Sequence, residues 1–577
     1  MKRSNIKLAV AVVLALSSSK AAYAQDITQI AKSDPLIITG AVGTKNTYYH
    51  STVGEGYASP WNNMFNVNLN ISLYGFSMPF SLYYTNDNTE FNYPHISFNL
   101  TPKYKNWTGY IGRASMPFSQ YVMNIAFNGV GLEYNNKTFR AGAFYGRLRS
   151  AVNDDPYNPA ARPPQYRRTG WGFKVGYGST RSYIDLYLLR AYDDLGSLNE
   201  GWRNRVYAQD NLVLGLKGCL TLKKWLSLTT NLATSVVTTD KQADLIAKGD
   251  VTKYDDIFKA RYSSLVRFAG DVSASITLPN FNTSFMYRMV QPDYTSLGTY
   301  YMSNNYHSLG VNVSTHLFRK ISLAANFSAQ EDNLTNKQLY TTRGFVYGAN
   351  AGTRLGSHFN VSVGYNGYLQ TQGNGTAVVN DTTRVKRGMN SFSLVPSFVT
   401  ETDNYSHAVS LSASYTENKD LNKFSYGLTD VKSIAMGASY ALGVKDWEMD
   451  FTASLSHQMS KGYDTKYTSD VASLTTGRSF LKDDNLTAEA TISLCYNEME
   501  HQSKNLSIGG EAAIGYTLKD VHVFSLTAGL YKYGDVNVTK TRSSLDATDL
   551  TVSFSYTYTF SLFQIKRKAK NDDNRKM

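Results

Sequence analysis

The sequence contains little cysteine: Cys219 and Cys495 are the only two among its 577 residues. Both lie in stretches where apolar and polar residues alternate, which places each thiol on the polar side of a predicted strand. Many predicted strands separate them, whereas a disulfide needs Cα atoms within about 7 Å. We therefore expect two free thiols and exclude a disulfide-stapled fold.

Long hydrophobic runs are also missing. Beyond the N-terminal leader no apolar run reaches about 18 residues, which excludes a transmembrane helix. The mean hydropathy of −0.33 suits a transmembrane barrel instead, because alternate residues of its strands face water. The leader combines basic Lys2, Arg3 and Lys7 with the apolar run 8–16 and the small residues of Ala22-Tyr23-Ala24. This pattern predicts a secretory signal peptide over residues 1–24.

Motifs for catalysis or nucleic-acid binding are absent as well. The sequence has no GxSxG, HExxH or glycine-rich phosphate loop in a strand–turn–helix context. Four of the positive charges leave with the leader, so the formal charge of +13 becomes 13 − 4 = +9. No basic helix or zinc-finger spacing accompanies that charge, which excludes a nucleic-acid partner. We expect no enzymatic activity, no cofactor and no metal site.

Strict two-residue alternation is what the sequence does contain, most clearly in Leu550–Phe563. From Leu550 to Leu562 one face of this stretch is apolar and the other carries only Ser and Thr, a pattern that predicts a strand. Thirteen residues at roughly 3.3 Å each, tilted by about 45°, cover the ~30 Å of a bilayer's hydrocarbon. We predict that this strand closes a barrel and carries the signal read by the barrel-assembly machinery. The aromatic residues expected to form that signal are Phe554, Tyr556, Tyr558, Phe560 and Phe563.

Short and long connections alternate along the chain, as in bacterial outer-membrane barrels. Twelve short turns and thirteen longer loops give 26 strands, and losing hairpins within 79–126 or 467–477 would reduce the number to 22 or 24. The sequence therefore predicts one all-β domain, an antiparallel barrel over residues 36–563. Residues 25–35 leave no room for an N-terminal plug domain and are expected to be periplasmic. The even number of strands places both termini in the periplasm, including a basic C-terminal tail at 564–577.

Three short runs resemble a known family. Residues Ser115–Tyr121, Gly129–Glu133 and Phe144–Leu148 resemble large outer-membrane barrels of the Bacteroidota, porin-like or associated with secretion. The resemblance implies a fold and an outer-membrane location more than an activity.

Charges inside the predicted wall form the best candidate site, which we call the charge ladder. Alternation places six charged residues inward, whereas Tyr110, Phe144, Leu148 and their neighbours are expected to face lipid. The ladder has two interpretations. It is either a salt-bridge network that stiffens the wall, or a selectivity or docking patch in which positive charges outnumber negative ones by four to two. Its members are Arg113, Glu133, Arg147, Arg149, Lys174 and Asp185.

The predicted function is a translocation or diffusion pore gated by inward loops or by a partner, such as a plug or a lipoprotein. The loop Ser150–Arg168, rich in Pro and Tyr, is either a rigid surface loop or a constriction of the lumen. The alternative is a barrel that transports nothing and docks lipoproteins or surface polymers. In either case we expect contacts with outer-membrane lipid and lipopolysaccharide.

Overall fold

The computed structural model describes residues 36–53, 60–74, 76–86, 96–153, 163–199, 206–246, 258–481, 485–535 and 547–565, with side chains up to residue 560. The predicted signal peptide, the predicted periplasmic segment 25–35 and the predicted tail beyond residue 565 lie outside the described residues.

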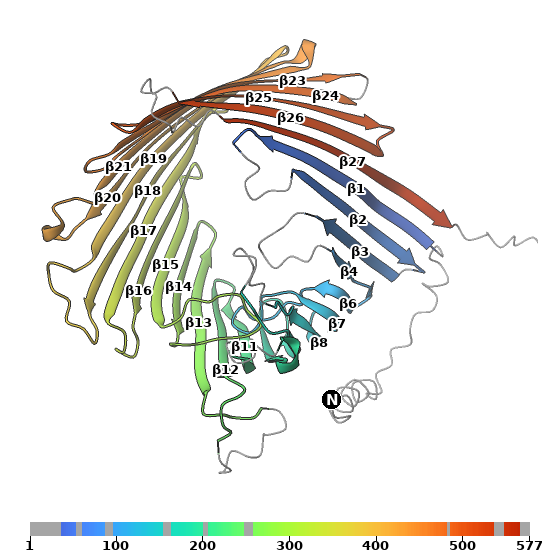
Figure 1. The fold of residues 1–577 in the computed structure, drawn as a ribbon, viewed down its shortest axis with the longest axis vertical. Helices are drawn as coiled ribbons and strands as arrows, with labels where there is room; N and C mark the ends of the chain where they lie inside the picture. Colours follow the sequence, from blue (N-terminus) through green and yellow to red (C-terminus); the bar gives the residue numbers. More distant parts are fainter. Residues whose placement is uncertain are drawn as a thin grey trace, which may run out of the picture.

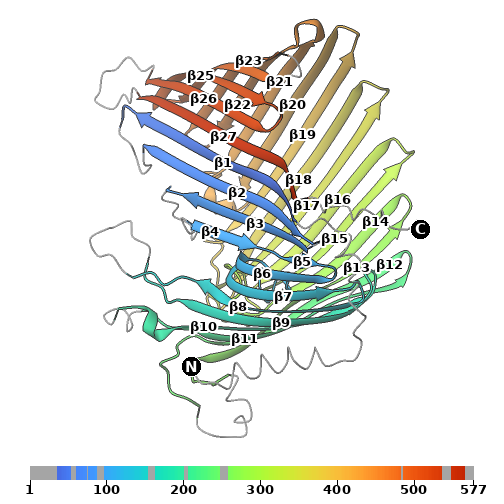
Figure 2. The same ribbon diagram turned by 90° about the vertical axis from the view of Figure 1, so that its right-hand side faces the viewer.

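The described chain is built from strands, joined into one sheet (Figures 1 and 2). The strands are β1 (Leu36–Ser51), β2 (Trp61–Leu73), β3 (Phe76–Thr85), β4 (Ile96–Leu100), β5 (Lys103–Tyr104), β6 (Trp107–Ala114), β7 (Phe127–Asn135), β8 (Phe139–Arg149), β9 (Arg168–Gly178), β10 (Tyr183–Asp193), β11 (Asp210–Lys223), β12 (Leu226–Thr238), β13 (Ser264–Leu278), β14 (Phe281–Val290), β15 (Tyr306–Leu317), β16 (Ile321–Asp332), β17 (Tyr340–Leu355), β18 (Phe359–Asn374), β19 (Lys386–Glu401), β20 (Tyr405–Asp420), β21 (Val431–Val444), β22 (Met449–Lys461), β23 (Lys466–Phe480), β24 (Leu486–Met499), β25 (Ser503–Leu518), β26 (His522–Asp535) and β27 (Ala547–Ile565). Short 3₁₀ turns occur at Leu195–Ser197, Lys423–Ser425 and Lys445–Trp447. Within the described residues no helix has the length and apolar character needed to cross a membrane.

The sheet closes into an antiparallel barrel of 26 strand positions. The short segments β4 and β5 both pair with β3 and with β6, so together they fill one position, and 27 − 1 = 26. Closure is made by β1 and β27, which pair antiparallel from Leu36–Ile565 to Ser51–Asp549 with one irregularity between Ile38 and Gly40. The predicted fold class, strand number and closing strand are therefore confirmed.

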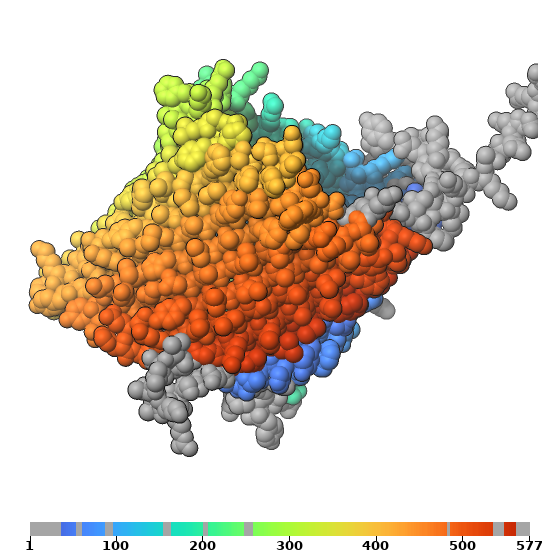
Figure 3. All heavy atoms as spheres, turned by 90° about the horizontal axis from the view of Figure 1, so that it is seen from above, coloured from blue at the N-terminus to red at the C-terminus, as the bar shows by residue number. Residues whose placement is uncertain are grey.

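Exposed side chains identify the two faces of the wall. On β20 to β24 the large residues Leu411, Met436, Leu455, Leu474 and Ile492 are exposed on one face. Residues that are directly opposite on paired strands point to the same side, so these side chains form one apolar outer surface. Figure 3 shows the later strands, in orange and red, as a closed outer wall. Ser and Thr alternate with them and face inward.

The two rims of the barrel differ. One rim carries the short turns, where non-glycine residues such as Lys105, Lys137, Glu448 and Asp520 take a positive φ. The other rim, which we call the long-connection rim, carries the connections that follow β1, β3, β6 and every second strand after β6, and these are longer than the turns except after β22 and β24. Aromatic pairs such as Phe76–Tyr104, with ring centroids 4.1 Å apart, lie near the short-turn rim. Such rings suit the boundary between lipid and water.

Candidate functional site

The connection between β6 and β7, residues 115–126, folds into the barrel and not outward (Figure 1). We call it the inward segment. Strand β6 ends at Ala114, and Pro117 in the following Ser-Met-Pro-Phe sequence has no N–H to donate to a ladder. The chain therefore leaves the wall and returns only at Phe127. The sequence motif Ser115–Tyr121, which carried the family resemblance, lies in this segment.

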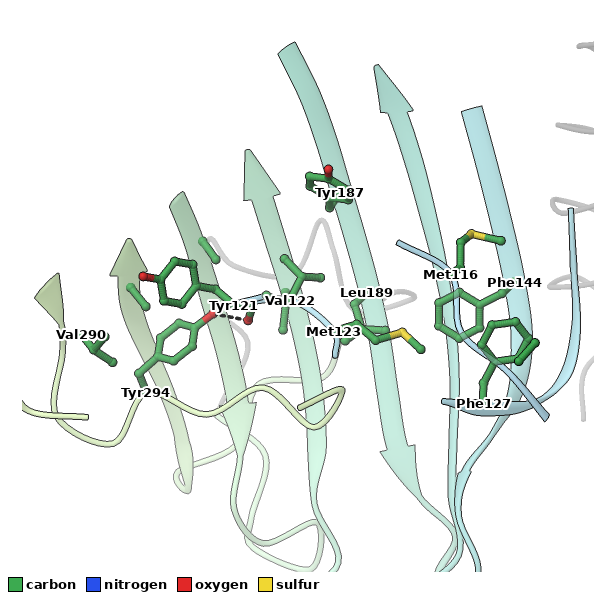
Figure 4. Close-up of a cluster of buried hydrophobic side chains, with 14 residues drawn as sticks. Met116, Tyr121, Val122, Met123, Phe127, Phe144, Tyr187, Leu189, Val290 and Tyr294 are labelled. Carbon is green, nitrogen blue, oxygen red and sulfur yellow. Dashed lines mark hydrogen bonds between the residues drawn. The ribbon is translucent and has the colours of Figure 1, made fainter. Parts of the chain in front are cut away.

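Apolar contacts fix the inward segment against the inner face of β8 to β14 (Figure 4). Val122 is fully buried, as are Leu189 of β10 and Val213 of β11. Phe127 stacks on Phe144 of β8 at a centroid distance of 4.6 Å. Burial of several such side chains, at about 1.5–3 kcal/mol each, makes the segment a stable part of the wall.

Small wall residues make room for the close approach. A Cβ on Gly215 of β11 would lie 2.4 Å from Cγ2 of Val122, and one on Gly142 of β8 would lie 3.2 Å from the sulfur of Met116. Opposite Gly215 on β12 stands Ala233, which is also buried in the cluster. The wall under the segment is therefore shaped to receive it.

Polar contacts set the position of the segment along the wall. The Tyr121 hydroxyl donates to Asp271 Oδ2 on β13 at 2.5 Å, and Ser119 Oγ donates to Asn231 Oδ1 on β12 at 2.6 Å. Burial, assisted by the hydrogen bond to Asp271, raises the pKa of Tyr121 above its usual range, so this hydroxyl remains a donor at neutral pH. Gln120 Nε2 donates to the same carboxylate at 3.1 Å.

A second connection, residues 291–305 between β14 and β15, also lies inside the barrel and packs on the inward segment. Met123 and Gly298 form a parallel bridge, and Ser296 Oγ donates to the Val122 carbonyl at 2.5 Å. Tyr294 is buried, and its hydroxyl donates to the Tyr121 carbonyl at 2.8 Å (Figure 4). This stretch includes one of the thirteen longer loops that the sequence predicts, at Gln291–Met302, and no local signal in it indicated the inward course.

Two members of the charge ladder hold this arrangement together. Lys174 Nζ on β9 bonds Glu133 Oε1 on β7 at 2.6 Å and the Pro117 carbonyl of the inward segment at 3.2 Å. The Tyr110 hydroxyl donates to the other oxygen of Glu133 at 2.7 Å. Both charged side chains are about nine-tenths buried, so the pair clamps the segment to the wall.

The third inward member, Asp185 on β10, pairs with a residue that the sequence analysis did not include. Arg140 of β8 donates to Asp185 Oδ1 from Nε at 3.0 Å and from Nη2 at 2.8 Å. Arg149 lies at the long-connection rim, where it bonds the Tyr166 carbonyl and reaches Asp193 at 3.4 Å. These pairs fit the interpretation of the ladder as a salt-bridge network better than its interpretation as an open selectivity or docking patch.

Two ladder residues face the other way. Tyr110 and Phe144 pack with the inner cluster, so Arg113 and Arg147, which are an odd number of residues away on the same strands, lie on the outer face. Arg147 is exposed beside the exposed Tyr145. The inward placement of Arg113 and Arg147, and the lipid-facing placement of Tyr110, Phe144 and Leu148, were therefore wrong. The cause is the inward segment, which gives the inner face here an apolar surface to contact.

The loop Ser150–Arg168 is described at residues 150–153 and 163–168, and residues 154–162 lie outside the described residues. Both interpretations of the loop, a rigid surface loop and a constriction, stay predictions. Val152 bridges Gln165, and Tyr166 is fully buried against Leu198 and Ala208 of the β10–β11 connection.

The closing strand shows the expected outward aromatic face. Phe554 is exposed opposite Asn46, and the Tyr556 hydroxyl lies 2.9 Å from Nδ1 of His522 on β26. Tyr558 stacks on the same imidazole at 4.7 Å and neighbours Phe560 at 5.5 Å. The backbone of Phe563 pairs with Ile38, and its side chain lies outside the described residues. Whether assembly factors read these residues stays a prediction.

The inner face of β19 to β24 has a different chemistry. Six serines stand directly opposite one another across these six strands, and each is partly exposed. We call this set the serine row; its members are Ser397, Ser410, Ser439, Ser454, Ser473 and Ser493. Ser454 and Ser473 share a hydrogen bond of 2.7 Å, and Thr475 and Thr491 beside them share one of 3.0 Å. This part of the wall offers hydroxyl groups without fixed charge.

A hollow of about 510 Å³ lies between the inward segment and the wall. Its polar lining includes Gln120, Asn124, Lys217, Asn231 and Asp271. No group of three or more His, Cys, Asp or Glu side chains placed to hold a metal ion occurs among the described residues.

No known protein family and no curated protein matches the sequence. Among solved structures the chain is similar to Acinetobacter baumannii OccAB2, at 10% identity over 66% of this chain and 96% of that chain, with a TM-score of 0.29. Pseudomonas aeruginosa OccK8 (OprE) is 10% identical over 68% of this chain and 98% of that chain, with a TM-score of 0.30. The P pilus usher PapC translocation pore is 11% identical over 91% and 100%, with a TM-score of 0.26. Scores this low carry no argument about the activity of this chain.

Proposed function

We propose that the chain forms a pore across the outer membrane of a bacterium, through which hydrophilic solutes or a chain of them pass along the serine row. The inward segment and the connection 291–305 narrow the lumen from the opposite side. Both termini then lie in the periplasm, on the side of the short turns.

The outer face supports the membrane location. Leu455 and Ile492 are each 62% exposed on it, which is costly in water and favourable in hydrocarbon. Strands such as β20 and β25, each of 16 residues, are long enough to span a bilayer when tilted by about 45°.

The observation that supports a water-filled pore is the partly exposed polar inner face of β19 to β24, which lies behind an apolar outer face. Hydroxyl groups on the inner face of β19 to β24 remain partly exposed, as they are where water fills the space beside them. A lumen packed like a protein interior would instead bury that face, as the inward segment buries the inner face of β10 to β13.

Conductance in planar bilayers tests the proposal, using the purified full-length protein. Ser454→Lys and Ser454→Glu place opposite charges in the serine row, and their reversal potentials are expected to shift toward anion and cation selectivity respectively. Wall charges act over about a Debye length, roughly 8 Å at physiological salt, so the shift should grow as salt is lowered.

The matched control places the same two charges at Thr382, an exposed residue of the β18–β19 connection, where a much smaller shift is expected. A correctly folded protein that conducts nothing, or equal shifts at both positions, would overturn the pore along the serine row. Loss of conductance with the fold intact would favour the alternative, a barrel that docks lipoproteins or surface polymers.

A further inference from the structure

Three lysines stand in direct register on adjacent strands of the outer face. Lys432 of β21 lies opposite Lys461 of β22, and Lys461 lies opposite Lys466 of β23. Each shares the face of an exposed apolar residue four or more positions along its strand, such as Met436 or Leu474, so the three point outward near the long-connection rim. We call them the lysine row.

Like charges directly opposite each other destabilise a pair of strands, and here three follow in sequence. The neighbouring carboxylate Glu417 is shared between Lys419 at 3.0 Å and Lys432 at 3.5 Å. Within the described residues Lys461 and Lys466 have no carboxylate within ion-pair distance, although Asp464 lies in the short connection between them. Glu498 of β24 is near enough to Lys466 to interact with it electrostatically, but its ion pair is with Lys504. The row and Lys419 together therefore carry more positive charge than the shared carboxylates Glu417 and Glu498 balance.

An apolar hollow of about 330 Å³ adjoins this charge. Phe327, Phe345 and Leu369 of β16, β17 and β18 line it, and Gly388 of β19 leaves it open. Lys419 stands at its edge and connects it, through Glu417, to the lysine row. An apolar recess beside a row of cations is complementary to a molecule that has an acyl chain and an anionic headgroup.

We propose that this face binds a glycolipid with two phosphate groups, its phosphates on the lysine row and Lys419 and one acyl chain in the hollow. The inference rests on the proposed outer-membrane location. Four lysines on four adjacent strands extend over about 14 Å, at roughly 4.8 Å per strand. A single phosphate contacts only part of that width, whereas a disaccharide headgroup phosphorylated at both ends reaches across it.

The site is confined to β20–β23. On the next strands Lys504 pairs with Glu498 at 2.9 Å, so the local charge there is balanced. On β16 and β17 the outer-face Arg343 is likewise paired with Glu331 at 3.0 Å.

The test uses the full-length protein in a neutral detergent, titrated with a diphosphorylated glucosamine-disaccharide lipid (lipid A), its monophosphorylated form, or phosphatidylglycerol. Bound lipid is counted by native mass spectrometry, and unfolding temperature is followed in parallel. The wild type should bind the diphosphorylated lipid about tenfold more tightly than either other lipid, because charge-assisted contacts to the second phosphate are lost in both.

The variant Lys432→Gln/Lys461→Gln/Lys466→Gln should lose that tenfold preference, and in lipid-free detergent it should unfold at the same or a higher temperature than the wild type. The corresponding triple Arg variant should keep the preference. A control, Lys223→Gln/Lys224→Gln at the short-turn rim, should bind as the wild type does.

Equal binding of the diphosphorylated and monophosphorylated lipids by the wild type, or undiminished preference in the triple Gln variant, would overturn the site. Equal binding of phosphatidylglycerol would mean a general anionic-lipid surface and would also overturn it. Conductance of the triple Gln variant should equal that of the wild type, so a failure of the pore and a failure of the lipid site give separate readouts.

Discussion

Two regions of the inner wall of this barrel, β8–β14 and β19–β24, differ in what covers them. Over β8–β14 the inner face includes an apolar strip with several glycines, and the inward segment covers this strip with Val122 and Leu189 fully buried. Over β19–β24 the inner face is a partly exposed serine row. The outer faces of both regions carry exposed apolar residues such as Val175 and Leu455, so the difference arises from what covers the inside. One sheet therefore supplies both a packed core and a wet surface.

The largest expected effect comes from placing the same charge on both inner faces. Ala269→Arg puts a guanidinium where Ala269 has no exposed surface, and burying an unpaired ion costs several kcal/mol. Ser473→Arg places it on the serine row, where water and the partly exposed wall accommodate it. Heat-modifiable gel migration should show folded barrel for the second variant and little for the first. An equal loss of folded barrel in both variants would show that the two inner faces do not differ in burial.

A second experiment breaks the clamp on the inward segment. Lys174→Met leaves Glu133 buried without its partner, which is expected to cost about 3–5 kcal/mol in the free energy of unfolding. Adding Glu133→Gln removes the unpaired charge and should recover much of that loss. The matched change Arg343→Met breaks an exposed pair on β17 and should cost about 0–1 kcal/mol. The three variants are compared by their urea unfolding midpoints. Equal effects of Lys174→Met and Arg343→Met would show that the Lys174–Glu133 pair does not hold the inward segment to the wall.

The smallest expected effect comes from adding a single methyl group, either under the inward segment or on an inner face that no described segment covers. Gly215→Ala places a Cβ against Val122 and should destabilise the protein by about 1–3 kcal/mol through overpacking. Gly344→Ala on the inner face of β17 meets no atom within 4 Å and should be neutral or stabilise by about 0.4–1 kcal/mol. Thermal unfolding of both variants measures the difference. Equal destabilisation would mean that the contact with Val122 is not tight.

Two-residue alternation predicted the barrel and its closure by β27, because every strand of a wall between lipid and water has one apolar and one polar face. The number of strands, 26, followed from the alternation of short turns and long loops. Two-residue alternation failed at Phe144 and Tyr110, where the inner face is not wet. A signal was present: the stretches Leu186–Leu189 and Leu212–Leu216 are apolar on both faces. Strands of that kind are buried on both sides, which indicates that something covers them from within.

What covers them was not readable from the sequence. The motif Ser115–Tyr121 stood out, but its partners Asp271 and Tyr294 lie about 150 residues or more further along the chain. Arg140 was missed as the partner of Asp185 for a related reason: pairing across two strand positions depends on register, which alternation alone does not fix.

The position of the inward segment along the chain has a consequence for how the barrel is made. Every residue that packs in the buried cluster lies between Tyr110 and Tyr306, whereas β27 begins 547 − 306 = 241 residues after Tyr306. Contacts that close shorter loops form sooner. We expect the cluster to assemble on an open, curved sheet before the first and last strands meet. When the first and last strands pair, the inward segment would then already be packed against the inner face of β8 to β14. Insertion into the membrane must preserve this packing.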